Sequence, residues 1–205
     1  MITTQLTTRQ IMNRIYEDIC GFDIPKNDEK LVRQSKGSPV YGEITHQSIC
    51  KLLDYLNLSN RDVFFDLGSG VGKVVLQVRL LSKVKRAIGV ELSTTRYQEA
   101  NLALARSLEF MPGLKNRCCF INDDLMNVDL KKATIIYTCS TAFSMAFMKK
   151  IADRLSHYHH PFRLVSLQDL PPNKWFELVE TIKLDMSWIR KTPVHIYRRI
   201  PKKAA

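Results

Sequence analysis

The chain has 205 residues, of which 45% are hydrophobic and 25% are charged. This composition is typical of one globular domain and excludes a disordered chain, which lacks the apolar surface needed to offset its conformational entropy. Thirty-one lysines and arginines outnumber 20 acidic residues, so the formal net charge is +11. The excess positive charge favours acidic partners such as nucleic acid or nucleosomes, although a solvated basic surface without a partner has the same composition.

The sequence shows no signal for export, membrane insertion or metal binding. Its longest apolar runs fall far short of the ~20 residues of a membrane span, and the N-terminus carries no apolar signal region. Five scattered cysteines show neither the paired spacing of a zinc site nor a disulfide framework. We therefore expect no metal, no membrane contact, reduced thiols and a cytoplasmic location, with the nucleus or delivery into another cell as alternatives.

The sequence before residue 58 predicts two helices joined by a connecting segment. Apolar residues recur at helical spacing in residues 5–20, which predicts an amphipathic helix. Residues 21–40 are polar and contain two prolines, which indicates a connecting segment that ends in a turn. A second amphipathic helix is predicted over residues 45–57.

Strand and helix patterns alternate through the rest of the chain. The predicted strands cover residues 62–67, 86–91, 118–123, 133–139 and 162–167, and the predicted helices cover residues 71–82, 94–110 and 141–155. Strands separated by helices of this length are typical of a doubly wound parallel sheet. Two further strands, residues 176–188 and 193–200, are joined by a short basic turn and predict a C-terminal antiparallel hairpin. We expect an α/β fold with a mostly parallel, seven-stranded sheet.

A glycine-rich loop joins the first strand to the helix that follows it. It reads D-L-G-S-G-V-G-K from Asp66 to Lys73, and its glycines allow the backbone to turn tightly and approach a ligand. The spacing differs from the G-x-G-x-x-G of a dinucleotide site and lacks the G-K-[ST] ending of a phosphate-binding loop. An acid at position 66 would repel a pyrophosphate, yet it suits a ligand that carries ammonium and sulfonium charges. The loop therefore predicts S-adenosylmethionine as cofactor.

Acidic residues also end the second and third predicted strands. Glu91 stands where a carboxylate can accept hydrogen bonds from both ribose hydroxyls, and Asp124 can accept from an adenine amino group while Leu125 covers the ring. Carboxyl ends of neighbouring parallel strands meet at one crevice of an open sheet, so these acids are expected close to Asp66. Singly, Asp66 or Asp124 could cap a helix and Glu91 could be a surface residue.

These residues, together with V-Y-G-E at 40–43, form a recognisable pattern. V-Y-G-E followed by a helix and then by V-F-F-D-L-G-S-G-V-G-K-V-V-L-Q-V at 63–78 resembles the disruptor-of-telomeric-silencing (Dot-type) histone lysine methyltransferases. Ser187-Trp188 and Pro193-Val194 are similar to the family's closing hairpin. The resemblance implies a non-SET, Rossmann-like class I methyltransferase fold. It implies an N-terminal helical lid with the V-Y-G-E loop over residues 1–58 and a cofactor-binding methyltransferase domain over residues 59–205.

The resemblance also implies a set of cofactor-binding residues. Tyr41, Gly42 and Glu43 would form a loop over the methionine moiety, Asp66, Gly68, Ser69 and Gly70 would hold its amino acid end, Glu91 the ribose, and Asp124 and Leu125 the adenine. The family has Thr where this chain has Ile44, and Gln where it has Lys73. Lys73 either points to solvent or pairs with the cofactor carboxylate.

The half of the site expected to hold the methyl acceptor differs more from the family. A lysine acceptor must first lose its proton, which an apolar, partly aromatic channel favours by desolvation. Tyr41, Tyr137, Phe143 and Tyr197 are predicted to line such a channel beside Cys139. Cys139 stands where the family has Asn, and Ile196 stands where it has a channel aromatic. Cys139 and Phe143 could instead be core residues, Trp188 is expected to anchor the hairpin by packing, and His195 is expected to be exposed.

Three functions remain open at this point. The resemblance implies a protein-lysine N-methyltransferase that acts on a histone or another basic or DNA-associated protein. A methyltransferase of RNA or a small molecule is the second, but neither an N-P-P-[YF] motif nor a basic stripe interleaved with aromatics is present. The third is a non-catalytic, cofactor-binding chromatin module, because the family's Asn is lost. Small basic clusters, including Lys149-Lys150, Arg190-Lys191 and Lys202-Lys203, could contact nucleic acid.

Overall fold

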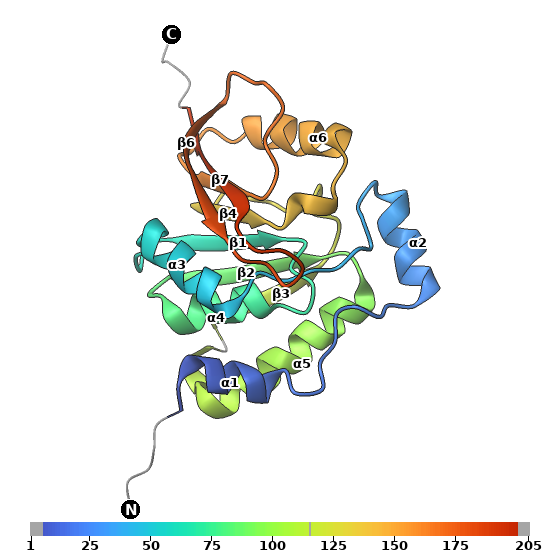
Figure 1. Cartoon of the computed structure of the whole chain (residues 1–205), viewed down its shortest axis with the longest axis vertical. Coiled ribbons are helices and arrows are strands. Elements are labelled where there is room, and N and C mark those ends of the chain that lie inside the picture. The colour runs from blue at the N-terminus through green and yellow to red at the C-terminus, as the bar shows by residue number, and fades with distance from the viewer. Residues whose placement is uncertain (1–5, 115, 201–205) are drawn as a thin grey trace, which may run out of the picture.

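A computed structural model describes residues 6–114 and 116–200, and Figure 1 shows the arrangement of its elements. Its seven strands are β1 (Val63–Leu67), β2 (Arg86–Glu91), β3 (Cys118–Asn122), β4 (Ile135–Thr138), β5 (Arg163–Ser166), β6 (Phe176–Leu184) and β7 (Thr192–Arg199). They form one sheet in the order β3-β2-β1-β4-β5-β7-β6. The first five strands run parallel, and β7 pairs antiparallel with both β5 and β6. The predicted α/β fold and its C-terminal hairpin are confirmed.

Helices cover both faces of the sheet. They are α1 (Thr8–Ile15), α2 (Lys26–Gln34), α3 (His46–Leu56), α4 (Lys73–Leu81), α5 (Thr94–Phe110) and α6 (Met145–Ser156), with short 3₁₀ turns η1 (Pro112–Leu114) and η2 (Ser140–Ala142). Neighbouring side chains of a strand point to opposite faces. Phe64 therefore packs in a core with α1, α3 and α4, whereas Phe65 packs with α6 on the other face.

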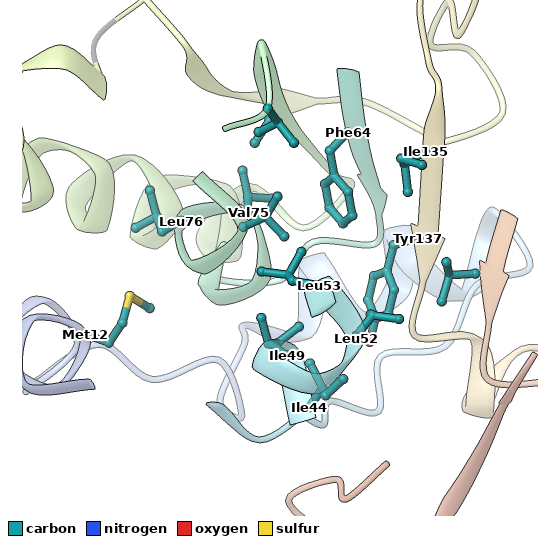
Figure 2. Close-up of a cluster of buried hydrophobic side chains, with 14 of the residues drawn as sticks. Met12, Ile44, Ile49, Leu52, Leu53, Phe64, Val75, Leu76, Ile135 and Tyr137 are labelled. Atoms are coloured by element: carbon teal, nitrogen blue, oxygen red, sulfur yellow. The ribbon is translucent and has the colours of Figure 1, made fainter. Parts of the chain in front are cut away.

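The N-terminal helices share the core of the sheet. Figure 2 shows Leu52 and Leu53 of α3 close to Phe64 and Tyr137, with Met12 of α1 at the margin of the same cluster. Full burial of such an apolar side chain contributes about 1.5–3 kcal/mol to stability. The segment before β1 is therefore packed against the sheet, and this packing also holds the loops between its helices in place.

The prediction of a connecting segment over residues 21–40 was wrong in part, because α2 lies inside it. The helix follows Pro25, carries Asp28 in its first turn and Arg33 in its last, and these features suit the helix macrodipole. Val32 is its only buried residue. Hydrophobic periodicity could not reveal a helix with so narrow an apolar face.

Two other helices, α1 and α6, begin at least three residues later than predicted. The helix predicted over residues 5–20, whose first residue lies outside the described part of the chain, covers only Thr8–Ile15. Arg106 of α5 donates a hydrogen bond to the Ile15 carbonyl, which satisfies one acceptor at the helix end. The helix predicted from residue 141 begins at Met145, because the Ser144 side chain accepts from the Phe147 N–H as N-cap.

The strand order identifies the edge of the sheet at which a ligand is expected to bind. The order reverses between β1 and β4, and in an open α/β sheet ligands bind outside the carboxyl ends of the strands at such a point. Asp66 near the end of β1 lies in register with Gly89 of β2 and Tyr137 of β4. Among residues 6–114 and 116–200, no helix is long and apolar enough to cross a membrane, and no cluster of His, Cys, Asp or Glu could hold a metal ion.

Candidate functional site

A cavity of about 400 Å³ lies at this edge of the sheet. Its walls come from the segment before α3, the glycine loop, the ends of β2 to β4 and the tip of the β6–β7 hairpin. The predicted site residues that line it are Tyr41, Gly42, Glu43, Asp66, Gly68, Ser69, Gly70, Lys73, Glu91, Asp124, Leu125, Tyr137, Cys139 and Phe143. Stretches that lie far apart in the sequence thus meet at one site.

The glycine loop adopts a backbone that other residues rarely adopt. Gly68 and Gly70 have φ values of +83° and +55°, in the left-handed region that favours glycine. The N–H groups of Gly68 and Ser69 donate to the Val90 carbonyl at 2.9 and 3.0 Å. The ring of Tyr41 packs directly on Gly70, where an added Cβ would lie 2.4 Å from Tyr41 Cε2. At Gly70 the loop therefore forms a floor of bare backbone beneath Tyr41.

Asp66 is buried at the bottom of the cavity. It is 2% exposed, and its Oδ1 atom has no hydrogen-bond partner among the described residues. Burial and the neighbouring Glu91 carboxylate raise the pKa of Asp66 well above its usual value. The Ser69 hydroxyl is also buried without a partner in the described chain. A buried polar group left unpaired is costly, so both groups fit a ligand that brings donors or positive charge to this end of the cavity.

Glu91 holds the glycine loop through a hydrogen bond to its carboxylate. Its Oε2 accepts from the Gly70 N–H and its Oε1 from the Ser93 N–H, each at 2.8 Å. Burial raises the pKa of Glu91, and these two hydrogen bonds together with the Arg96 charge offset part of the rise. Each carboxylate oxygen retains a lone pair, so the side chain can still accept from two hydroxyl groups. Asp124 follows β3, where its Oδ1 accepts from the Met126 N–H at 2.8 Å.

The V-Y-G-E loop is tied to α4 by Glu43. The Tyr41 hydroxyl donates to Glu43 Oε1 at 2.8 Å, and Lys73 Nζ donates to Glu43 Oε2 at 2.7 Å. Lys73 also lies over the ring of Tyr16, 5.2 Å from its centroid. Sequence reasoning offered solvent or a cofactor carboxylate as the partner of Lys73, and missed this ion pair within the site.

The side of the cavity formed by the end of β4 and the turn after it lies next to Asp66 and is largely apolar. Tyr137, Cys139 and Phe143 line it, and the Tyr137 hydroxyl is buried with no hydrogen-bond partner in the described chain. Burial, reinforced by the Asp66 charge, raises the pKa of the Cys139 thiol to about 12. The thiol is therefore uncharged at neutral pH and offers a weak donor and a weak acceptor.

Two expectations for the hairpin, those for Tyr197 and His195, were wrong. Tyr197 faces α6 rather than the cavity, because it alternates with Ile196 on β7, and its hydroxyl donates to Asp169 and accepts from the Leu170 N–H. Trp188 packs the hairpin tip against another segment, as predicted, but it is also 45% exposed and lines the cavity. Its ring packs on Gly42, where an added Cβ would lie 2.2 Å from Trp188 Cζ3. His195 is buried rather than exposed, beside Thr181.

Sequence reasoning also missed residues that shape the cavity near Cys139 and Phe143. Thr141 lines the cavity, and Gln168 holds the turn that contains it by donating from Nε2 to the Thr141 and Phe143 carbonyls at 2.8 and 3.0 Å. Arg96 lines the cavity near Tyr41. No local motif marks Arg96 or Gln168, because each acts on segments far away in the sequence.

Comparisons with known proteins identify the relatives of this chain. The model of the family described as "Histone methylation protein DOT1" matches residues 23–190. An H3 lysine-79 specific histone-lysine N-methyltransferase from Caenorhabditis elegans is 33% identical over 146 residues, and one from Drosophila melanogaster is 29% identical over 154. The aligned regions cover 67% and 70% of this chain, but only 15% and 8% of those proteins. A protein-lysine N-methyltransferase from Saccharolobus islandicus is 27% identical over 86 residues, or 42% of this chain and 50% of that protein.

Solved structures agree on the fold. An RNA methyltransferase from Salinibacter ruber, in complex with S-adenosyl-L-homocysteine, superposes with a TM-score of 0.57 at 22% identity, covering 78% of this chain and 94% of that chain. The tRNA methyltransferase TrmK from B. subtilis gives a TM-score of 0.57 at 15% identity, covering 78% and 67%. At such identities the likeness concerns the fold alone, which is that of the class I methyltransferases. The family match covers most of the chain, and the protein belongs to the histone methylation protein DOT1 family.

Proposed function

We propose that the chain is an S-adenosylmethionine-dependent protein-lysine N-methyltransferase whose substrate is a histone or another basic, DNA-associated protein. One observation carries the proposal: an acid buried without a partner among the described residues, Asp66, lies beside the glycine loop and Glu91, and the wall of the same cavity next to it is apolar. The charged half suits a cationic cofactor, and the apolar half suits an amine that must be uncharged to react.

The residues of the charged half fit S-adenosylmethionine. Asp66, with the glycine floor, would hold its ammonium end, Glu91 its ribose hydroxyls, and Asp124 and Leu125 its adenine. The buried and unpaired Asp66 Oδ1 and Ser69 hydroxyl would thereby gain the partners that the described residues do not supply. When bound, the cofactor supplies an electrophilic methyl group on sulfur.

The apolar half would prepare and align the acceptor. Tyr137 and Phe143 exclude water, and desolvation lowers the pKa of a lysine amine, so that the neutral, nucleophilic form is favoured. Walls that hold the nitrogen near ~3 Å from the methyl carbon convert the reaction into an effectively unimolecular step. The neutral Cys139 thiol leaves this space without a competing charge.

We further propose that residues 1–58 act as a lid on a methyltransferase domain formed by residues 59–205, including the terminal residues that the structure does not describe. Val32 and Ser35 at the end of α2 and Tyr41 in the V-Y-G-E loop already form part of the cavity wall. The lid would keep water from the reacting groups and complete the cofactor site.

Transfer of labelled methyl from S-adenosylmethionine tests the proposal directly. The protein is incubated with nucleosomes, free histones, RNA and a cell lysate, and the same reactions are run with Asp66→Asn. We expect label on a histone lysine, lost in the variant. Label confined to RNA or small molecules would move the substrate to another class. Cofactor binding without any transfer would identify a non-catalytic module and make Cys139→Asn the next variant to examine.

Nucleosome binding is expected to weaken steeply with added salt. Arg190 is exposed at the hairpin tip, two residues from the cavity-lining Trp188, so a nucleosomal substrate would place DNA phosphates near it. Each phosphate contact contributes about 0.9 to the slope of log K against log salt. Arg190→Gln should reduce that slope by about 1, whereas the exposed Arg61, just before β1 at the opposite edge of the sheet, should tolerate the same change. Equal slopes for both variants would refute a contact at the hairpin tip. The basic pair Lys202-Lys203 lies outside the described residues.

A further inference from the structure

We infer that Arg96 is a positioning residue that closes residues 22–38, the lid segment, over the cofactor site. Arg96 lies in the first turn of α5 and is 4% exposed. Its Nε donates to the Gly21 carbonyl at 2.9 Å and its Nη2 to the Pro39 carbonyl at 2.8 Å. These carbonyls stand immediately before and after the lid segment, so one guanidinium joins its two ends.

The same guanidinium also supports Tyr41. It lies over the Tyr41 ring, 4.8 Å from the centroid, and Phe22 meets that ring edge-on at 5.1 Å. Tyr41 in turn contacts both Gly21 and Gly70, where an added Cβ would lie 2.4 Å from its ring atoms. Arg96 therefore connects both ends of the lid segment, residues 22–38, to the aromatic ring that packs on the glycine loop.

The lid segment has a second attachment to the same turn of α5. Asp28 of α2 accepts from the Ser93 hydroxyl at 2.6 Å and from the Thr95 N–H at 2.9 Å. Figure 1 shows α2 beside the N-terminal end of α5, where these contacts occur. Burial opposes ionisation of Asp28, but the Ser93 and Thr95 hydrogen bonds outweigh it and lower its pKa. Val32 and Ser35 can line the cavity because both attachments hold α2 in place.

Arginine suits this task for a geometric reason. Its planar guanidinium presents several donors in a fixed fork and can stack on an aromatic face at the same time. A lysine ammonium is a point charge and cannot reproduce two diverging hydrogen bonds together with the stacking contact. Holding a wall of the site in its bound conformation reduces the ordering cost of ligand binding. The inference rests on the proposed function only in naming that ligand as S-adenosylmethionine.

Arg199 provides a matched control. It is 2% exposed, donates to the carbonyls of Ser156, Tyr158 and Trp175, and lies over the Trp175 ring at 5.0 Å from the centroid. It has the same chemistry as Arg96 but does not line the cavity. A loss of stability in both Arg96→Lys and Arg199→Lys would reflect the removal of a buried arginine. A change in ligand binding confined to Arg96→Lys would reflect an effect on the site.

The experiment compares wild type, Arg96→Lys and Arg199→Lys by two readouts. Calorimetry with S-adenosylhomocysteine should give about tenfold weaker binding for Arg96→Lys, the factor expected for the loss of one hydrogen bond to a charged group, and little change for Arg199→Lys. Limited trypsin digestion should cut the lid segment, at Lys26, Lys30, Arg33 or Lys36, faster in Arg96→Lys alone. With turnover, KM for the cofactor should rise more than kcat falls.

The outcomes separate the inference from the proposed function. Equal affinities and equal lid digestion in the two variants would overturn the role of Arg96. If wild type fails to bind S-adenosylhomocysteine, the proposed cofactor is wrong. The digestion experiment then tests the role of Arg96 by itself. Selective cutting in Arg96→Lys would then support the closure of the lid segment, and its absence would refute it.

Discussion

Replacing Asp66 with asparagine is expected to stabilise the fold at neutral pH and to weaken cofactor binding severely. Burial and the Glu91 carboxylate raise the pKa of Asp66 in the folded state well above its usual value of 3.8. As the pH rises from the unfolded pKa towards the folded pKa, the unfolded state binds fewer protons, so the carboxyl lowers the free energy of unfolding. The substituted asparagine carries no charge, so this loss disappears, while the partner of a cationic cofactor disappears with it.

The measurements are thermal unfolding across the pH range and calorimetry with S-adenosylmethionine. The difference in Tm between variant and wild type should widen as the pH increases above the unfolded pKa, with each kcal/mol worth about 2–4 °C in a chain of this size. Cofactor affinity should fall about 100-fold or more, as expected when a hydrogen bond to a charged group is lost from a buried site. A lower Tm for Asp66→Asn at neutral pH would show that the acid is already paired in the free protein.

Asp62 supplies the opposite case just before the same strand. It accepts from Ser59 and Thr134, and although burial opposes ionisation, these hydrogen bonds lower its pKa. A lowered folded pKa adds stability above the unfolded pKa, and that stability is lost as the pH falls through the folded value. Asp62→Asn should therefore lower Tm at neutral pH and leave cofactor affinity unchanged, because Asp62 does not line the cavity.

Substituting Gly70 with alanine is expected to disrupt the cofactor site with the second largest effect. The residue has a φ of +55°, and its new Cβ would lie 2.4 Å from the Tyr41 ring. Alanine in the left-handed region costs about 1–2 kcal/mol, and the clash must also move Tyr41 off the loop. We expect a lower Tm and at least about tenfold weaker binding of S-adenosylhomocysteine in calorimetry.

Gly113→Ala is the matched control for this change. An added Cβ at Gly113 meets no atom within 4 Å, and the residue has no positive φ. Tm and affinity should both stay near the wild-type values. Unchanged affinity in Gly70→Ala would mean that Tyr41 is not required where it now packs. A double variant with Tyr41→Leu should show non-additive losses if the two residues act through contact.

Local patterns predicted the sheet well, and they predicted that Asp66, the glycine loop and Glu91 meet at one edge of it. Short apolar runs located the buried parallel strands, and the stretch from Asp66 to Lys73 determines the glycine loop within consecutive positions. Strand order then brought Glu91 beside Gly70, as expected for the carboxyl ends of parallel neighbours.

The features that sequence reasoning missed depend on contacts between segments that are far apart in the sequence. Arg96 bonds to residues 57 and 75 positions away, and such pairs leave no periodic signal. The helix α2 was missed because its polar residues face solvent and its attachment is a carboxylate, Asp28, rather than an apolar stripe. Tyr197 was misplaced by one position, and on a strand a shift of one residue exchanges one face of the sheet for the other.

The packing of Trp188 on Gly42 has a consequence for how such sites diversify. The hairpin tip that carries Trp188 is held by the ladder between β6 and β7, and it reaches the cavity without contributing to the glycine loop. Ser187 beside Trp188 exchanges two hydrogen bonds with the main chain of Glu43, so the hairpin tip and the V-Y-G-E loop hold each other in place. A change in the length of the hairpin would therefore move the V-Y-G-E loop as well, so these two segments of the cavity wall must vary together.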